Sequence, residues 1–87
     1  DLALLVPDGV RGGAVLATMR GAAGEFVEGV SLFDVYRGEG IPEGTRSMAF
    51  SLRFRAPDRT LKDKEVDRAV SRVLSTLEEE FGVRQRA

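Results

Sequence analysis

The segment SMAFSLRFR, residues 47–55, alternates between apolar and polar side chains with a period of two. Its apolar positions are Met48, Phe50, Leu52 and Phe54. Because successive side chains of a β-strand point to opposite faces of its sheet, this period predicts a strand with one face on a core and one in water. The polar positions carry hydroxyls and guanidiniums, which favour a polyanion over a small apolar ligand as the partner of that face.

A second strand is predicted over residues 27–37, and the glycine-rich segment RGEGIPEGT separates it from the first. If the two strands pair antiparallel with Phe33 and Val35 facing the core, a set of polar side chains shares the opposite, open face. These are Asp34, Tyr36, Ser47, Arg53 and Arg55. An aromatic ring, a carboxylate, a hydroxyl and arginines on one face can stack on and hydrogen-bond an unpaired base. The pattern equally fits an ordinary solvated sheet face, and the two arginines equally fit ion pairs with neighbouring strands.

The composition of the 87 residues excludes several classes of site. There is no cysteine and no histidine, so thiolate metal sites, disulfides and the commonest general base are excluded. An enzyme that uses carboxylates and lysine stays possible on composition, but no sequence feature favours one, so we expect a domain that is not an enzyme and holds no metal or cofactor. Because 13 basic residues stand against 14 acidic ones, for a net charge of −1, we do not expect indiscriminate binding to nucleic acid. No apolar run reaches the length of a membrane span.

The order of the predicted elements indicates the fold class. Strands are expected at residues 2–6, 27–37, 46–55 and 83–86, and amphipathic helices at residues 12–23 and 63–81. This βαββαβ order predicts an α+β, ferredoxin-like plait: a four-stranded antiparallel sheet with both helices on one face, forming a single domain over residues 1–87. Alternation also places Ala3, Arg84 and Arg86 on the open face. Because the chain begins without methionine, inside the apolar run LALLV, we expect it to be part of a longer protein.

Three segments carry a resemblance to a known family: LFDVYRGEGIPEG at residues 32–44, SMAFSLRFR at 47–55 and DRTLKDKEV at 58–66. Together they resemble the C-terminal ferredoxin-fold anticodon-binding domain of bacterial phenylalanyl-tRNA synthetase β chains. The resemblance covers nearly the whole chain. It departs from the family at Lys62, where members usually have threonine or serine.

The resemblance implies an RNA-binding role for particular residues. In that family the domain recognises the anticodon stem-loop of phenylalanine tRNA. Tyr36 matches the tyrosine that stacks on the first anticodon base, Asp34 the acidic residue that contacts that base, Ser47 a hydroxyl contact and Ala3 a small residue that lines the base. A guanine offers Asp34 two donors, N1–H and its amino group, and an adenine cannot offer the same pair.

The resemblance also implies the setting of the domain. The expected partners are the phenylalanine tRNA, the remainder of the β chain and the synthetase α chain, in the cytoplasm and away from membranes. ATP and magnesium are expected in the full class II synthetase and not in this noncatalytic domain. A ferredoxin-like fold hosts many functions, so one alternative stays open. It is a regulatory or assembly domain that binds a small molecule or a partner protein through the same sheet face.

Overall fold

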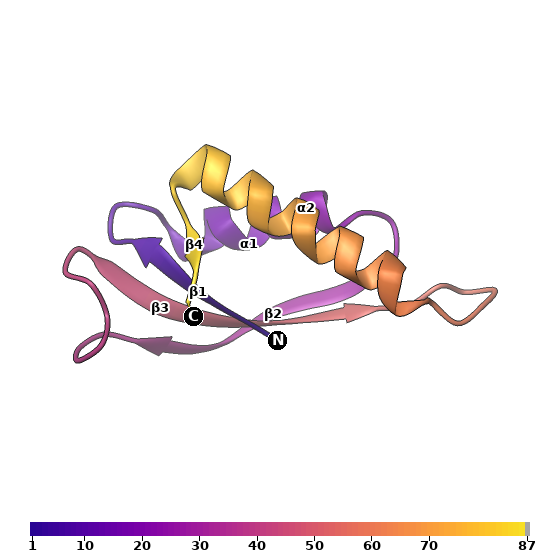
Figure 1. Cartoon of the computed structure of the whole chain (residues 1–87), viewed down its shortest axis with the longest axis horizontal. Coiled ribbons are helices and arrows are strands. Elements are labelled where there is room, and N and C mark those ends of the chain that lie inside the picture. The colour runs from indigo at the N-terminus through magenta and orange to yellow at the C-terminus, as the bar shows by residue number, and fades with distance from the viewer. Residues whose placement is uncertain (87) are drawn as a thin grey trace.

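The structure is a computed structural model that describes residues 1–86, so residue 87, the last of the predicted domain, lies outside the described residues. The elements in chain order are β1 (Leu2–Pro7), α1 (Gly12–Ala23), β2 (Val27–Tyr36), β3 (Thr45–Phe54), α2 (Asp63–Phe81) and β4 (Arg84–Gln85). Figure 1 shows the sheet as one layer and both helices on the same side of it. The predicted α+β plait is therefore confirmed, and the bounds of both helices agree with the prediction.

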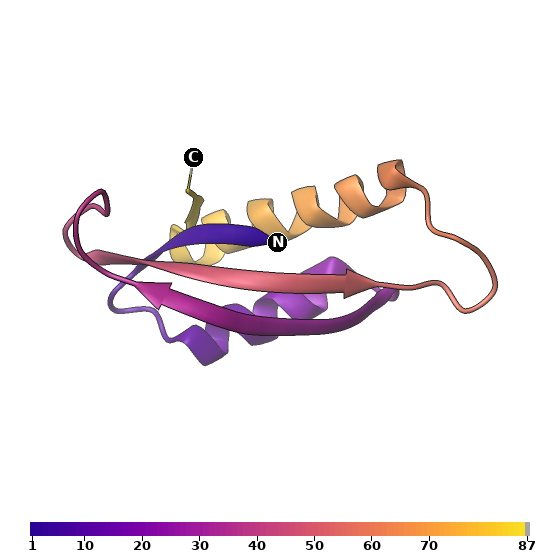
Figure 2. The same ribbon diagram turned by 90° about the horizontal axis from the view of Figure 1, so that it is seen from below.

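The strands form one antiparallel sheet in the order β2-β3-β1-β4. β2 and β3 make a long hairpin, and β1 lies on the other side of β3, with Leu4 opposite Met48. The short strand β4 closes the far edge by pairing with β1. Figure 2, seen from below, has the face of the sheet without helices toward the viewer.

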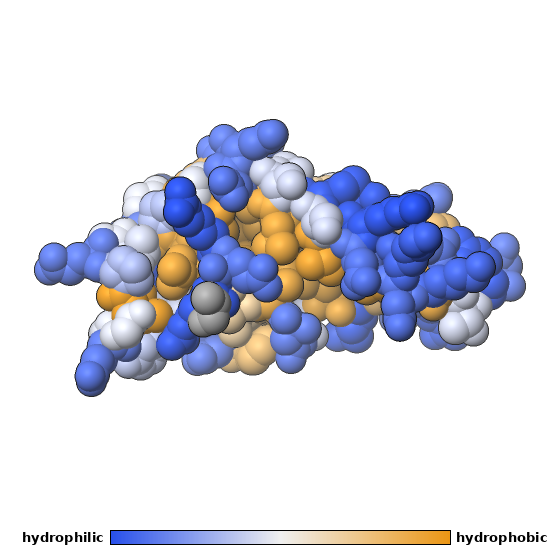
Figure 3. Space-filling view, in the orientation of Figure 1, coloured by the Kyte–Doolittle hydropathy of each residue, from blue (hydrophilic) through white to orange (hydrophobic). Residues whose placement is uncertain are grey.

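The core lies between the sheet and the two helices. Alternate residues of β1 and β3 point into the core, and each helix contributes about one residue per turn from a single face. The fully or almost fully buried residues include Leu4, Val6, Met48 and Phe50 from the sheet, Val15 and Met19 from α1, and Val73 and Leu77 from α2. The inward prediction is confirmed for Met48 and Phe50, and Leu52 and Phe54 are half-buried against the same core. Apolar surface remains visible between α2 and the sheet (Figure 3).

The prediction that Phe33 faces the core is wrong, because Phe33 is 58% exposed. Leu32 pairs with Phe50 and Asp34 pairs with Ala49, so that residue 33 has no partner of its own in β3. Such an extra residue is a β-bulge, which leaves one residue unpaired and locally disrupts the ladder. The bulge changes the parity of β2, so within residues 29–32 the even-numbered residues, not the odd ones, lie on the core side, until a second register shift between Val27 and Gly29.

The prediction for Val35 is confirmed for the side of the sheet on which it lies, but Val35 is not buried in the core. Val35 lies opposite Met48 and therefore on the helix side of the sheet, as expected. It is nevertheless 49% exposed, because β2 is the edge strand and residue 35 is near its end. Val30, in the middle of the same strand, is the β2 residue that is buried.

One arginine is part of the packing beneath the helices. Arg46 lies opposite Val6 and is 9% exposed. Its guanidinium donates to the backbone carbonyls of Pro7, at 2.9 Å, and Val10, at 2.7 Å. It thereby ties the start of β3 to the turn between β1 and α1, with its charge satisfied by these carbonyl oxygens and by the Asp8 carboxylate at 4.0 Å.

Candidate nucleic-acid interface

The strand register brings four of the predicted site residues together on the open face. Tyr36 lies directly opposite Ser47, and Asp34 lies opposite Ala49. Ala3 of β1 is the other partner of Ala49, on the far side of β3. Since Ser47 and Ala49 have the parity that points away from the helices, Tyr36, Asp34, Ser47 and Ala3 occupy one continuous patch across three neighbouring strands.

The two β2 residues of this patch are accessible from solution. Tyr36 is 41% exposed, and its hydroxyl donates to the backbone carbonyl of Glu39 at 3.2 Å. This bond ties the end of the ring to the β2–β3 loop and leaves the ring itself partly uncovered. Asp34 is exposed, and its carboxylate makes no hydrogen bond or ion pair with a side chain or backbone group of residues 1–86. An aromatic ring and an unengaged carboxylate therefore lie side by side on an uncovered sheet.

Ser47 differs from its neighbours because it is only 5% exposed, although no helix covers this face. Arg86, immediately beyond β4, reaches over it. The Arg86 guanidinium lies 3.4 Å from Ser47 Oγ, as a long hydrogen bond, and its central carbon lies 5.9 Å from the centre of the Tyr36 ring. Alternation had placed Arg86 on this face, but nothing in the sequence predicted that its side chain would cross the sheet to β2.

Arg53 and Arg55 are not brought together with the other predicted residues. Arg53 is six residues from Ser47 along β3, a separation of about 20 Å at about 3.4 Å per residue. Its guanidinium lies against Gly29, in space that a side chain at position 29 would fill. Arg55 follows the end of β3, where its guanidinium nitrogen Nη1 lies 4.0 Å from the carboxylate oxygen Oε1 of Glu28. Both are exposed, so contact with RNA at these positions stays a prediction.

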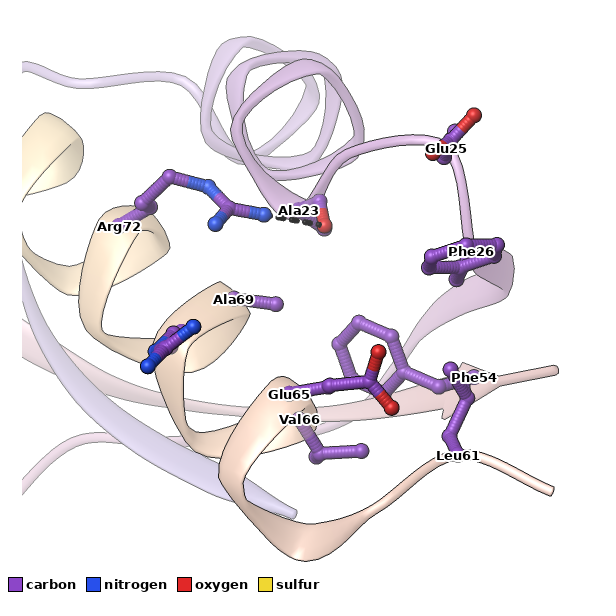
Figure 4. Close-up of a pocket in the computed structure, with 10 residues that line it drawn as sticks. Ala23, Glu25, Phe26, Phe54, Leu61, Glu65, Val66, Ala69 and Arg72 are labelled. Atoms are coloured by element: carbon purple, nitrogen blue, oxygen red, sulfur yellow. Dashed lines mark hydrogen bonds between the residues drawn. The ribbon is translucent and has the colours of Figure 1, made fainter. Parts of the chain in front are cut away.

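One of the hollows described lies on the helix side of the sheet (Figure 4). It encloses about 460 Å³ between the end of α1 and the first half of α2, and its apolar lining includes Phe26, Phe54 and Val66. Two of the four charged residues that line it, Glu65 and Arg72, are paired within the chain. Arg72 donates to the carbonyls of Ala22 and Ala23, both at 3.3 Å.

Glu65, at the rim of the same hollow, is held by two partners. Both of its carboxylate oxygens accept hydrogen bonds of 2.7 Å from Arg59, and the backbone N–H of Lys62 donates at 2.9 Å. These bonds, the Arg59 bond foremost, lower the pKa of the Glu65 carboxyl to about 2. Such a carboxylate stays ionised at neutral pH and is a poor general base.

Within the described part of the chain, no group of three or more acidic, histidine or cysteine side chains is arranged to hold a metal ion. No helix among residues 1–86 is both long and apolar enough to span a membrane.

Comparison with known sequences fits this arrangement. The family model described as "Ferredoxin-fold anticodon binding domain" matches residues 1–86. The chain belongs to this family. As a ferredoxin-fold anticodon-binding domain it has the expected topology, with its two helices on one face and the other face uncovered.

The relatives of this anticodon-binding domain are much longer proteins. The chain is 46% identical over 82 residues to the "Phenylalanine--tRNA ligase beta subunit" of Geobacillus kaustophilus, covering 94% of the chain and 10% of the relative. It is 45% identical over 87 residues to the subunit of the same name from Synechococcus sp. strain JA-3-3Ab, covering 100% and 10%. For the Corynebacterium efficiens subunit the identity is 48% over 86 residues, covering 99% and 10%. The chain thus spans about a tenth of the length of these relatives.

Proposed function

We propose that this domain binds the anticodon stem-loop of phenylalanine tRNA through the open face of its sheet. The observation that carries the proposal is the partly exposed Tyr36 ring, beside the unengaged carboxylate of Asp34, on the face that the helices leave uncovered. Family membership supports the same partner through the name of the domain and of its relatives. Because the chain has no net positive charge, recognition of particular bases has to supply much of the affinity.

Each residue of the patch has a defined chemical role in this proposal. The Tyr36 ring stacks on the first anticodon base, a contact that depends on the face of the ring and not on the hydroxyl. Asp34 accepts hydrogen bonds from N1–H and the amino group of a guanine at that position. Ser47 supplies a further polar contact. Ala3 has a side chain small enough to let a base approach the sheet.

We further propose that the domain is a noncatalytic part of a phenylalanine–tRNA ligase β subunit. The relatives are about ten times longer than this chain, which leaves room for the aminoacylation machinery in other domains. In that setting ATP and magnesium are used elsewhere in a class II synthetase. The remainder of the β chain and the α chain are the protein partners, and the cytoplasm is the location.

Binding of RNA stem-loops to point variants tests the proposal. Two stem-loops are used that differ only in having guanine or adenine at the first anticodon position. Tyr36→Ala should weaken binding by about 1–3 kcal/mol, the usual range for one base–aromatic stack, whereas Tyr36→Phe should change it little. Asp34→Ala should mainly reduce the preference for guanine over adenine.

The composition of the chain provides a direct optical signal for this experiment. The two Tyr36 variants lack this signal, so their binding is followed with an end-labelled stem-loop. In the wild type and Asp34→Ala, Tyr36 is the single tyrosine and there is no tryptophan, so intrinsic fluorescence reports on this ring alone. We expect the guanine stem-loop to quench it, with an unrelated hairpin of equal length as the control. If Tyr36→Ala binds as tightly as the wild type, or the unrelated hairpin binds equally well, the proposal is wrong. Capture of a small molecule or partner protein by the same face would then be favoured.

A further inference from the structure

The burial of Ser47 raises a question about how the open face binds RNA. At 5% exposure the Ser47 hydroxyl cannot meet a base unless something moves, and yet no helix lies on this side of the sheet. The Arg86 guanidinium contacts both Ser47 Oγ, at 3.4 Å, and the Tyr36 ring, at 5.9 Å. One side chain therefore lies across two of the positions assigned to base recognition.

The backbone holds Arg86 at the edge of the patch. Its N–H donates to the Ala3 carbonyl at 2.8 Å, which continues the pairing of β4 with β1 by one residue. Between β4 and β2 the open face presents Ala3 and Ala49, which are partners in the β1–β3 register. Because both side chains are single methyl groups, they rise little above the sheet, and a long side chain from β4 can lie across them to reach β2.

We infer that Arg86 is a further RNA-binding residue: in the free domain it covers the base site, and on binding it moves aside and pairs with a phosphate of the anticodon loop. This inference rests on the proposed function. The contacts that hold Arg86 in place are weak, since a 3.4 Å hydrogen bond is long and a cation–π contact is modest at a solvent-exposed site. A guanidinium is always charged and matches phosphate oxygens with two parallel donors, so phosphate is the stronger partner.

Covering the base site weakens RNA binding and pairing with a phosphate strengthens it, but only the phosphate contact releases counterions. The decisive measurement is therefore the slope of log K for the guanine stem-loop against log salt concentration, with the 87-residue chain. Losing one phosphate contact to single-stranded RNA lowers that slope by about 0.7. For Arg86→Gln, the ratio of wild-type to variant affinity should then fall by about 2.5-fold between 50 and 200 mM salt.

Two further variants serve as controls. Arg86→Lys keeps the positive charge and should retain the wild-type slope. Arg68→Gln removes the same charge from α2, on the helix side of the sheet, and should leave the slope unchanged. Equal urea midpoints for Arg86→Gln and the wild type exclude an effect of unfolding.

The outcomes separate this inference from the proposed function. If the wild type binds the stem-loop and Tyr36→Ala weakens it, but Arg86→Gln keeps the full slope, only the inference about Arg86 is overturned. Tighter binding by Arg86→Gln at every salt concentration, with an unchanged slope, would overturn it as well, because Arg86 would then only obstruct the site. If the wild type does not bind the stem-loop at all, both proposals are refuted.

Discussion

Replacing Phe50 by alanine should remove a large part of the stability of the fold. Phe50 has no exposed surface and lies opposite Leu2 on one neighbouring strand and Leu32 on the other, beneath the helices. A phenylalanine buries roughly 150–250 Å², which at about 25 cal/mol per Å² corresponds to about 4 kcal/mol. The usual range for Phe→Ala in a core, about 3–5 kcal/mol, agrees with this value.

Phe33→Ala is the matched control, because it makes the same chemical change in the neighbouring strand. Phe33 is 58% exposed, so less than half of its surface is removed from water. On the same scale the expected loss is about 1–2 kcal/mol, and this is an upper estimate. Urea unfolding at pH 7, followed by far-UV circular dichroism, measures both variants. With a slope of about 1–3 kcal/mol per molar urea, their midpoints should differ by about 1 M or more.

The comparison tests the bulge as well as the core. If both variants lose about 4 kcal/mol, Phe33 is packed in the interior, and the pairing of β2 with β3 is in error near residue 33. If Phe50→Ala keeps the wild-type midpoint, the helices do not cover the face on which Phe50 lies.

Two further predictions concern charged residues. Glu65 has a folded-state pKa of about 2, below its usual 4.5, so its stabilising effect is complete above about pH 4.5 and is lost as the pH falls toward 2. Glu65→Gln should therefore lower the melting temperature at pH 7 but not at pH 2, and a difference that stays constant over this range would contradict the argument. Arg46→Met should cost about 2–4 kcal/mol in urea unfolding, since it leaves the carbonyls of Pro7 and Val10 without their charged donor. A wild-type midpoint for that variant would show that water replaces the guanidinium at no cost.

Local patterns were sufficient to predict both helices and the strand β3. The apolar stripe of α2 recurs at helical spacing, and Gly82 follows it with φ of +71°, a left-handed conformation that suits glycine and ends a helix. The shared face of Asp34, Tyr36 and Ser47 was also predictable, because parity near the hairpin loop is not interrupted by a bulge.

The errors came from features that no local pattern records. A β-bulge adds one residue without changing the apolar character of the strand, so Phe33 fits the sequence pattern of either face. The contact of Arg86 with Ser47 and Tyr36 depends on the strand order, which places β4 beside β1, and on the small residues between. Neither the order of strands nor the path of a long side chain can be taken from alternation alone.

The two irregularities of β2 have a consequence for how copies of the chain behave in concentrated solution. As an edge strand with exposed Leu32, Phe33 and Val35, β2 has the composition of a strand that recruits other strands and starts aggregation. Its pairing with β3 shifts between residues 27 and 29 and again between 32 and 34, so the longest uninterrupted stretch is residues 29–32. The direction in which the backbone N–H and C=O groups of β2 point therefore changes within a few residues. An incoming strand cannot extend this edge into a regular cross-β stack. Glu28 and Phe33, which have no partners in β3, thus interrupt an apolar edge that would otherwise offer a regular row of hydrogen-bonding groups to another strand.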